Sequence, residues 1–262
     1  MRRCVIVGGA EIRTYDRVRQ YFRPDDFFIY CDCGLRHQKA LGAEPDLIVG
    51  DFDSHEKPET DRETIVLPVK KEAMRRGFDE FLLVGVSGGR LDHTLVNVYL
   101  LVMLREQGKR ALLVDDYSEM ELVGAEKVEI PERFPFYSLV NITGTARGIM
   151  ETGCKFPLDN GEIRCDYQYG TSNEVLPGQT AAVSVKEGSL LLIKVFPRTP
   201  ERRVKASRKY YFKFLIEAAK KHGSGVKSSA AAYSISILTV IPLTSRILLI
   251  LNLFLFLFYF LY

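Results

Sequence analysis

Most of the chain lacks the excess of basic residues that a nucleic-acid-binding protein carries. Residues 1–197 contain 25 lysines and arginines against 31 acidic residues, a formal charge of −6, whereas residues 198–262 contain 11 against 2, a formal charge of +9. Binding to duplex DNA or RNA needs a basic face on the protein. The acidic body of the chain therefore argues against nucleic acid as the main ligand.

Cysteine pairs with the spacing of a structural zinc site are missing as well. The chain has five cysteines, an odd number: Cys4, Cys31, Cys33, Cys154 and Cys165. Cys31 and Cys33 have no second pair to complete a four-ligand site. Met1–Arg3 also runs straight into a short apolar stretch, without the longer apolar region of a secretory leader. We therefore expect reduced thiols in a cytoplasmic protein, and no soft metal at Cys31 and Cys33.

Acidic residues, by contrast, gather at the ends of predicted strands. Leu47–Val49 is an apolar run typical of the end of a buried strand, and Gly50 behind it is followed by Asp51 and Asp53. Strand residues at i and i+2 share a face, so the two carboxylates point the same way. They repel each other unless a cation lies between them. The pair indicates a Mg²⁺ site shared with the phosphates of a substrate; the alternative is an acidic, solvated turn.

Glycine turns follow two further predicted strands. Phe27–Cys31 ends at Asp32, and Phe81–Gly85 opens into the glycine-rich stretch Ser87–His93. A helix predicted from Thr94 to Glu106 begins beneath that stretch, and its unpaired amides favour an anion there. Three predicted strands thus carry polar groups at the same end.

Arg90 and its neighbours provide the groups that such an anion site needs. The guanidinium of Arg90 is a planar fork for phosphate oxygens, and Asp92 and His93 are the polar groups next to it. The alternative is a local salt bridge between Arg90 and Asp92, with His93 as a helix-start residue. The acids upstream favour the functional interpretation.

The order of elements predicts an open, mostly parallel α/β sheet in residues 1–120, followed by a small antiparallel β-sandwich or barrel in residues 121–197. Residues 198–262 form a separate tail. The other elements predicted in the first domain are strands over Cys4–Val7, Thr64–Val69 and Ala111–Val114, and helices over Tyr15–Phe22, Leu35–Leu41 and Lys70–Arg76. The strands predicted in the second are Val128–Ile130, Tyr137–Ile142, Gly161–Cys165, Gln179–Val185 and Ser189–Val195.

Five segments, taken in order, resemble the motifs of the thiamine pyrophosphokinase family. They are CDCGLRH (31–37), LGAEPDLIVGDFDS (41–54), VGVSGGRLDHTLVN (84–97), FPLDNGEI (156–163) and TSNEV (171–175). The resemblance implies a homodimer with thiamine bound between the subunits. It also implies Mg²⁺-dependent transfer of the diphosphate of ATP to the thiamine hydroxyl, with release of AMP.

The resemblance also implies roles for individual residues. Asp51 and Asp53 hold the metal, Arg90 neutralises the transferred group, and the general base is either Asp92 or a metal-bound aspartate. The catalytic set is Asp51, Asp53, Arg90 and Asp92; the nucleotide-binding set is Asp32, Gly34, Ser54, Lys70 and Arg90; the thiamine-binding set is Asp92, His93, Phe156, Ser172 and Asn173.

The chain departs from the family pattern at several positions. Phe156 replaces a pocket tryptophan but keeps a stacking face, and Cys33 replaces a small residue. Between Lys70 and Glu72 the family has about a dozen further residues, which carry a Thr-Asp pair and a third acid for the metal site and form a longer crossover helix. The alternative function is therefore a catalytically impaired homologue that binds nucleotide or thiamine, with or without a membrane tether.

The tail is foreign to the family. Ile247–Tyr262 consists only of Ile, Leu, Asn, Phe and Tyr, and its sixteen residues fall short of the ~20 that span a bilayer. Extending the segment back to Ile235 brings in Pro242 and Arg246, and an arginine inside a membrane is costly. Three interpretations remain: a membrane anchor within residues 235–262, a membrane-surface segment, or translated sequence that is not native to the gene.

Overall fold

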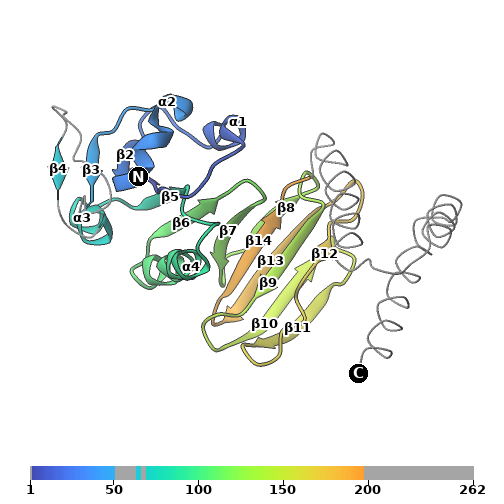
Figure 1. The fold of residues 1–262 in the computed structure, drawn as a ribbon. Coiled ribbons are helices and arrows are strands. Elements are labelled where there is room, and N and C mark those ends of the chain that lie inside the picture. The colour runs from blue at the N-terminus through green and yellow to red at the C-terminus, as the bar shows by residue number, and fades with distance from the viewer. Residues whose placement is uncertain (1, 51–62, 66–68, 198–262) are drawn as a thin grey trace, which may run out of the picture. The chain divides into compact units, whose positions relative to one another are not determined.

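The computed structural model describes residues 2–50, 63–65 and 69–197, with only the backbone of residues 69–71. These residues belong to one compact unit, Met1–Arg198. They form a ten-stranded sheet of order β12-β9-β14-β7-β6-β5-β1-β2-β3-β4 and a four-stranded sheet of order β11-β10-β13-β8 (Figure 1). None of the five cysteines, all of which lie in the described part, forms a disulfide.

One end of the larger sheet is parallel. Its strands are β1 (Arg3–Val7), β2 (Phe27–Cys31), β3 (Leu47–Val49), β4 (Thr64–Ile65), β5 (Glu80–Val84) and β6 (Arg110–Val114). All five neighbouring pairs within the order β6-β5-β1-β2-β3-β4 are parallel. From β1 the chain moves outward to β2 and β3, whereas from β5 it moves the opposite way to β6. The strand order therefore reverses between β1 and β5, which is where ligands bind in open α/β sheets.

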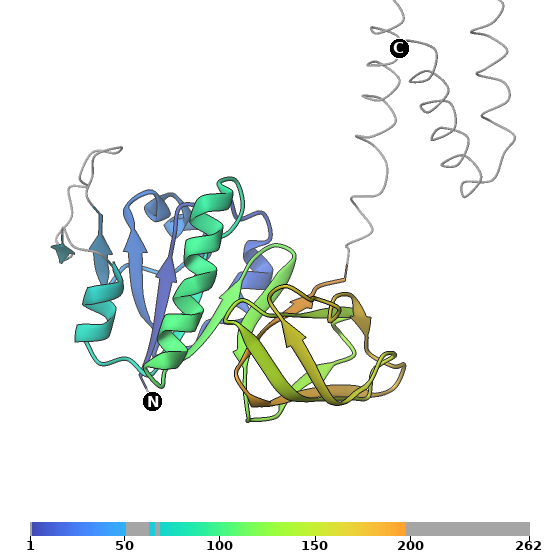
Figure 2. The same cartoon turned by 90° about the horizontal axis from the view of Figure 1, so that it is seen from below.

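Helices cover both faces of these strands because alternate residues point to opposite sides. The helical elements are α1 (Tyr15–Arg19), the 3₁₀ helix η1 (Asp32–His37), α2 (Gln38–Leu41), α3 (Val69–Arg75) and α4 (Leu91–Glu106). Val5 and Val7 of β1 pack in one cluster with residues of α1 and α2. Cys4 and Ile6 pack in another with residues of α3 and α4. Figure 2 shows α4 (green) and α3 (teal) lying together on one face of the strands.

Residues 118–195 form a β-sandwich. Its strands are β7 (Ser118–Val123), β8 (Val128–Pro131), β9 (Phe136–Val140), β10 (Thr145–Thr152), β11 (Leu158–Arg164), β12 (Asn173–Glu174), β13 (Thr180–Glu187) and β14 (Leu190–Val195). The small sheet packs on the antiparallel end of the large one, and the shared core contains Leu139 and Leu190 from the large sheet with Ile149 and Val183 from the small one. The larger sheet continues from β6 into the sandwich through the antiparallel β6–β7 pair.

The predicted fold class is confirmed, and the second domain is a sandwich of two sheets. Some elements differ from their predicted extents. The strand predicted over Thr64–Val69 is β4, Thr64–Ile65, and Val69 already starts α3; residues 66–68 lie outside the described part. The helix predicted at Thr94 starts at Leu91. The domain limit at residue 120 falls inside β7 and stays a prediction.

Candidate active site

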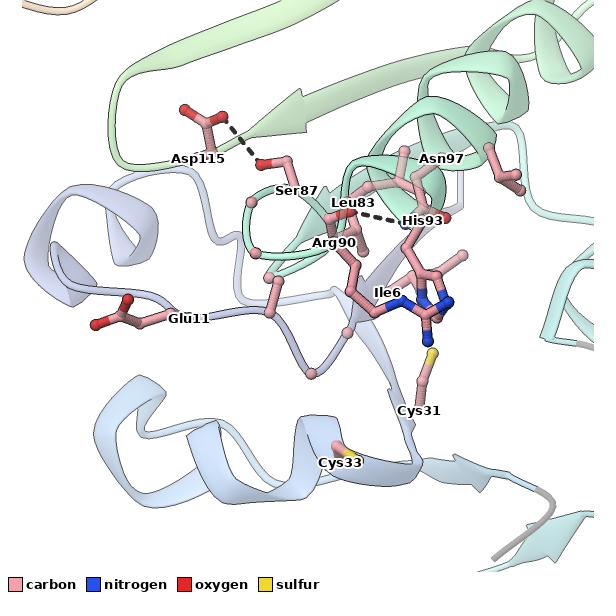
Figure 3. Close-up of a pocket in the computed structure, with 18 of the residues that line it drawn as sticks. Ile6, Glu11, Cys31, Cys33, Leu83, Ser87, Arg90, His93, Asn97 and Asp115 are labelled. Atoms are coloured by element: carbon pink, nitrogen blue, oxygen red, sulfur yellow. Dashed lines mark hydrogen bonds between the residues drawn. The ribbon is translucent and has the colours of Figure 1, made fainter. Parts of the chain in front are cut away.

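A cleft of about 1180 Å³ opens at the carboxyl ends of the parallel strands. The loops after β1, β2, β5 and β6 line it, so it lies at the point where the strand order reverses (Figure 3). Polar and charged residues from these loops gather in the cleft; they include Glu11, Asp32, Ser87, Arg90 and Asp115. The turns that end the predicted strands are thus brought to one place.

Glycines allow three of these loops to touch through their backbones. A Cβ atom on Gly34 would lie 2.2 Å from the carbonyl oxygen of Val7, and one on Gly8 would lie 2.5 Å from the carbonyl oxygen of Gly85. The N–H of Ala10 donates to that same Gly85 oxygen at 2.7 Å. The floor of the cleft is therefore main chain, with no room for a side chain at Gly8 or Gly34.

Asp32 lies at the end of β2 in the left-handed region of backbone conformation, with φ of 28°. A Cβ atom on Gly50 would lie 3.0 Å from the Cβ atom of Asp32, so Asp32 is beside the last described residue before Asp51. Its Oδ1 atom is buried and has no hydrogen-bond partner among the described residues. A buried carboxylate oxygen without a donor is costly, and a cation beside it would remove that cost. The donor chemistry of Asp32 therefore fits a hard cation such as Mg²⁺.

The rest of the predicted metal and nucleotide set is only partly visible. Asp51, Asp53 and Ser54 lie outside the described residues, and of Lys70 only the backbone, in α3, is described. In residues 2–50, 63–65 and 69–197 no group of three or more His, Cys, Asp or Glu side chains is arranged to hold a metal. The assignment of Asp51 and Asp53 to Mg²⁺ thus stays a prediction.

Arg90 and His93 extend into the cleft from the start of α4 (Figure 3). Arg90 also forms the local salt bridge with Asp92, in which its Nε atom donates to Oδ1 at 3.1 Å. The hydrogen bonds from Arg90 lower the pKa of the Asp92 carboxyl to about 2. A carboxylate held ionised in this way is a weak base, so the pairing disfavours Asp92 as the general base for as long as it persists.

Several polar residues that line the cleft or contact its lining were not among the predicted site residues. Ser87 donates its hydroxyl proton to Oδ2 of Asp115 at 2.9 Å, which ties the loop after β5 to the end of β6. His37 is buried, with Nδ1 at 2.8 Å from the hydroxyl of Tyr15 and Nε2 at 2.9 Å from the carbonyl oxygen of Ala10. Burial lowers the pKa of His37, which favours the neutral imidazole. Its hydrogen bond to Ala10 stabilises the loop after β1. The position of Asp115 behind a predicted strand was a usable signal, whereas nothing in the sequence indicates the contacts of His37.

The remaining predicted residues form a second group, in the β-sandwich. Phe156 is exposed, with 60% of its surface accessible, while Asn173 is buried at 5%. Ser172 is exposed in a left-handed conformation with φ of 59°, and its N–H donates to Oγ of Ser138 at 3.0 Å. Of the described residues that line the cleft, none comes from this group. The structure thus brings Asp32, Arg90 and His93 together but keeps them apart from Phe156, Ser172 and Asn173.

Comparison with known proteins shows what the chain is similar to. Residues 127–190, which make up most of the sandwich, match the family model described as thiamin pyrophosphokinase, vitamin B1 binding domain. Thiamine pyrophosphokinase of Bacillus subtilis (strain 168) is 24% identical over 212 residues, which are 74% of this chain and 99% of that protein. The chain is therefore similar to thiamine pyrophosphokinases over about three quarters of its length.

Solved structures of thiamine pyrophosphokinases share the fold. The Bacillus subtilis structure has a TM-score of 0.66 at 21% identity, covering 75% of this chain and 100% of its own. The Geobacillus thermodenitrificans structure has a TM-score of 0.63 at 23% identity, covering 76% and 99%. The Candida albicans structure has a TM-score of 0.60 at 12% identity, covering 75% and 89%. The α/β sheet and the sandwich are therefore the fold that the chain shares with these structures.

Proposed function

We propose that the chain transfers the diphosphate of ATP to the hydroxyl of thiamine. The observation that supports this most is the cleft at the reversal of strand order, where the unpartnered Oδ1 of Asp32 lies beside the residue that precedes Asp51. Residues 127–190 match a domain whose description names vitamin B1 binding, and the Bacillus subtilis relative is named as the enzyme. Together these observations favour a nucleotide in the cleft and thiamine against the sandwich.

In the proposed reaction the hydroxyl oxygen of thiamine attacks the β-phosphorus of ATP. The bond from that phosphorus to the oxygen bridging to the α-phosphate breaks, AMP leaves, and the hydroxyl proton passes to a base. Asp32, Asp51 and Asp53 would hold Mg²⁺, which supplies charge neutralisation at the phosphates when it is bound. Arg90 can turn from Asp92 to the phosphate oxygens because both side chains are exposed, at 70% and 61%. Such transfer depends mainly on positioning and electrostatics.

Thiamine reaches the cleft, in this proposal, through a second copy of the chain. Apolar side chains are exposed on α4, where Leu91 is 71% and Val96 69% accessible, and on the sandwich, where Phe156 is 60% and Tyr167 62% accessible. Exposed apolar groups on two surfaces favour association. A homodimer that sets the sandwich of one copy against the cleft of the other would join the two groups of predicted residues.

Asp51→Asn and Asp53→Asn test the assignment of the cleft. Each substitution should weaken the binding of Mg-ATP by at least about tenfold, because it removes a charged ligand of the metal. Each should leave the binding of thiamine nearly unchanged. Isothermal titration calorimetry with each ligand in turn measures both, with Asp159→Asn on the exposed face of β11 as the control. Equal losses for both ligands would indicate a folding defect and contradict the assignment.

The tail and the oligomeric state are tested together. Among the described residues no helix is long and apolar enough to cross a membrane, and residues 198–262 lie outside them. We propose a cytoplasmic enzyme; the alternative is association with membranes through residues 235–262. If these residues are an anchor, the full chain should sediment with lipid vesicles, and a chain ending at Pro197 should remain in solution as a dimer in analytical ultracentrifugation. A full chain that stays monodisperse without lipid or detergent would rule out the anchor, because an exposed apolar tail drives association.

A further inference from the structure

A buried carboxyl group that the proposed reaction does not use lies between the two sheets of the sandwich. Glu151 on β10 is 3% exposed, inside the segment that matches the vitamin B1 binding domain. Its Oε2 atom accepts a hydrogen bond from the hydroxyl of Tyr137 at 2.7 Å and another from Nδ2 of Asn173 at 3.0 Å. Tyr137 is 0% and Asn173 5% exposed, so the whole cluster is shielded from water. Burying a carboxyl group costs free energy, so the position of Glu151 in the core calls for a reason.

Asn173 connects this buried cluster to the surface. Its Oδ1 accepts a hydrogen bond from the backbone N–H of Phe156 at 3.1 Å, and its Nδ2 donates to the carbonyl oxygen of Phe156 at 2.9 Å. The amide therefore holds both polar groups of the Phe156 backbone, while the Phe156 ring is 60% exposed. Ser172, which precedes Asn173 in the chain, is exposed.

Glu151 stabilises the same orientation of the Asn173 amide that the Phe156 backbone requires. Nδ2 carries two protons: one goes to the Phe156 carbonyl, and the other faces Oε2 of Glu151 and the hydroxyl oxygen of Tyr137, 3.0 Å away. A flipped amide would set its oxygen against the acceptor oxygens of Glu151 and Phe156, and the Tyr137 hydroxyl already donates its proton to Glu151. Only the observed orientation satisfies all of these groups.

We propose that Glu151 is a positioning residue for the thiamine-binding surface: acting through Asn173, it fixes the ring of Phe156 and the adjacent Ser172. The inference rests on the proposed function, because it assigns these exposed residues to thiamine. The position of the ring itself, however, can be measured without any ligand.

Tryptophan fluorescence provides that measurement, because the native chain contains no tryptophan. Phe156→Trp creates a single reporter at the residue that the Asn173 amide holds. In this background Glu151→Ala should raise the acrylamide quenching constant about twofold and lower the fluorescence anisotropy. It should also raise the Kd for thiamine about tenfold, as expected for lost hydrogen bonds, and leave the Kd for Mg-ATP unchanged.

Matched variants separate positioning from general destabilisation. Glu151→Gln keeps an acceptor oxygen for Tyr137 and Asn173 and should restore both the quenching constant and the thiamine Kd to within about twofold. Glu187→Ala at the exposed end of β13 should change neither. Tyr137→Phe, which leaves the carboxyl group in place, should shift both readouts in the same direction by less, and it serves if Glu151→Ala does not fold.

The outcomes that overturn the inference are distinct from failure of the proposed function. A quenching constant that Glu151→Ala and Tyr137→Phe leave unchanged would overturn it. Failure of Glu151→Gln to restore the readouts would do the same, because charge rather than position would then matter. A reporter that responds to Glu151→Ala but not to thiamine would support Glu151 as the positioning residue for this surface and count against the assignment of thiamine to it.

Discussion

Inserting about a dozen residues that carry a Thr-Asp pair between Lys70 and Glu72 should raise thiamine-dependent release of AMP by on the order of a hundredfold. After β4, at one edge of the large sheet, the chain must pass β3, β2 and β1 to reach β5, and α3 provides only seven residues of helix for this crossover. A longer helix would cover more of the sheet, and the added aspartate would supply the third acid that the family resemblance implies. The melting temperature should rise by several degrees.

The acidic residues next to the short crossover are engaged elsewhere. Glu72 is 2% exposed, and its Oε1 accepts hydrogen bonds at 2.6 Å from both Arg75 and Arg76, which lower the pKa of its carboxyl to about 2. Asp79 pairs with Lys109 at 3.4 Å and lies near the start of β5, at the opposite end from the cleft. Neither residue lines the cleft. Neither therefore substitutes for the third acid in this arrangement.

A second insertion distinguishes the effect of the added aspartate from the effect of the longer helix. The same segment with Thr-Ala in place of Thr-Asp should raise the melting temperature equally but leave the release of AMP near that of the native chain. Both versions are assayed beside the uninserted chain. Full activity of the uninserted chain would show that the site is already complete and that the crossover needs no further residues.

Gly34→Ala should unfold the cleft at the carboxyl ends of the parallel strands. The new Cβ atom would lie 2.2 Å from the carbonyl oxygen of Val7, and backbone atoms on a central strand cannot move aside as a flexible side chain can. We expect a loss of about 3 kcal/mol in the free energy of unfolding. The melting temperature should fall by about 10 °C, and binding of Mg-ATP should be lost. Thermal unfolding followed by circular dichroism and calorimetry with Mg-ATP measure the two effects.

Gly161→Ala is the matched control for this substitution. Its Cβ atom would meet Leu158 Cδ1 at 3.2 Å, the end of a flexible side chain, so the melting temperature should change by no more than about 2 °C. If Gly34→Ala were as stable as this control, the loops after β1 and β2 would be able to separate without cost, and the close backbone packing would not form the floor of the cleft.

The sequence was sufficient to predict the parallel strands and the end of the sheet that carries the site. Phe27–Cys31 was predicted with its observed limits, and the acid behind it, Asp32, lies in the cleft as the strand-end rule requires. These features depend on local patterns, since an apolar run and a glycine turn can be recognised within a few residues.

Features that depend on distant pairing could not be predicted in the same way. β7 pairs with β14, so Val123 lies opposite Leu190, and no local pattern specifies a partner so far along the chain. The continuation of one sheet from β6 into the sandwich was missed for this reason. The buried contacts of Asn173 were missed as well, because its partners Tyr137 and Glu151 come from other strands.

The unbroken sheet also restricts how water can be kept from the reacting groups. Many two-domain transferases exclude water by a hinge motion that closes the two domains around the substrates. Here the hydrogen-bonded ladder runs from β5 through β6 and β7 to β14, and bending between the cleft and the sandwich would tear the Leu113–Met120 and Val114–Glu119 pairs. The α/β half and the sandwich of one chain therefore move together as one rigid body. Shielding of the phosphates must come from loops at the cleft or from the surface of a second molecule pressed against it.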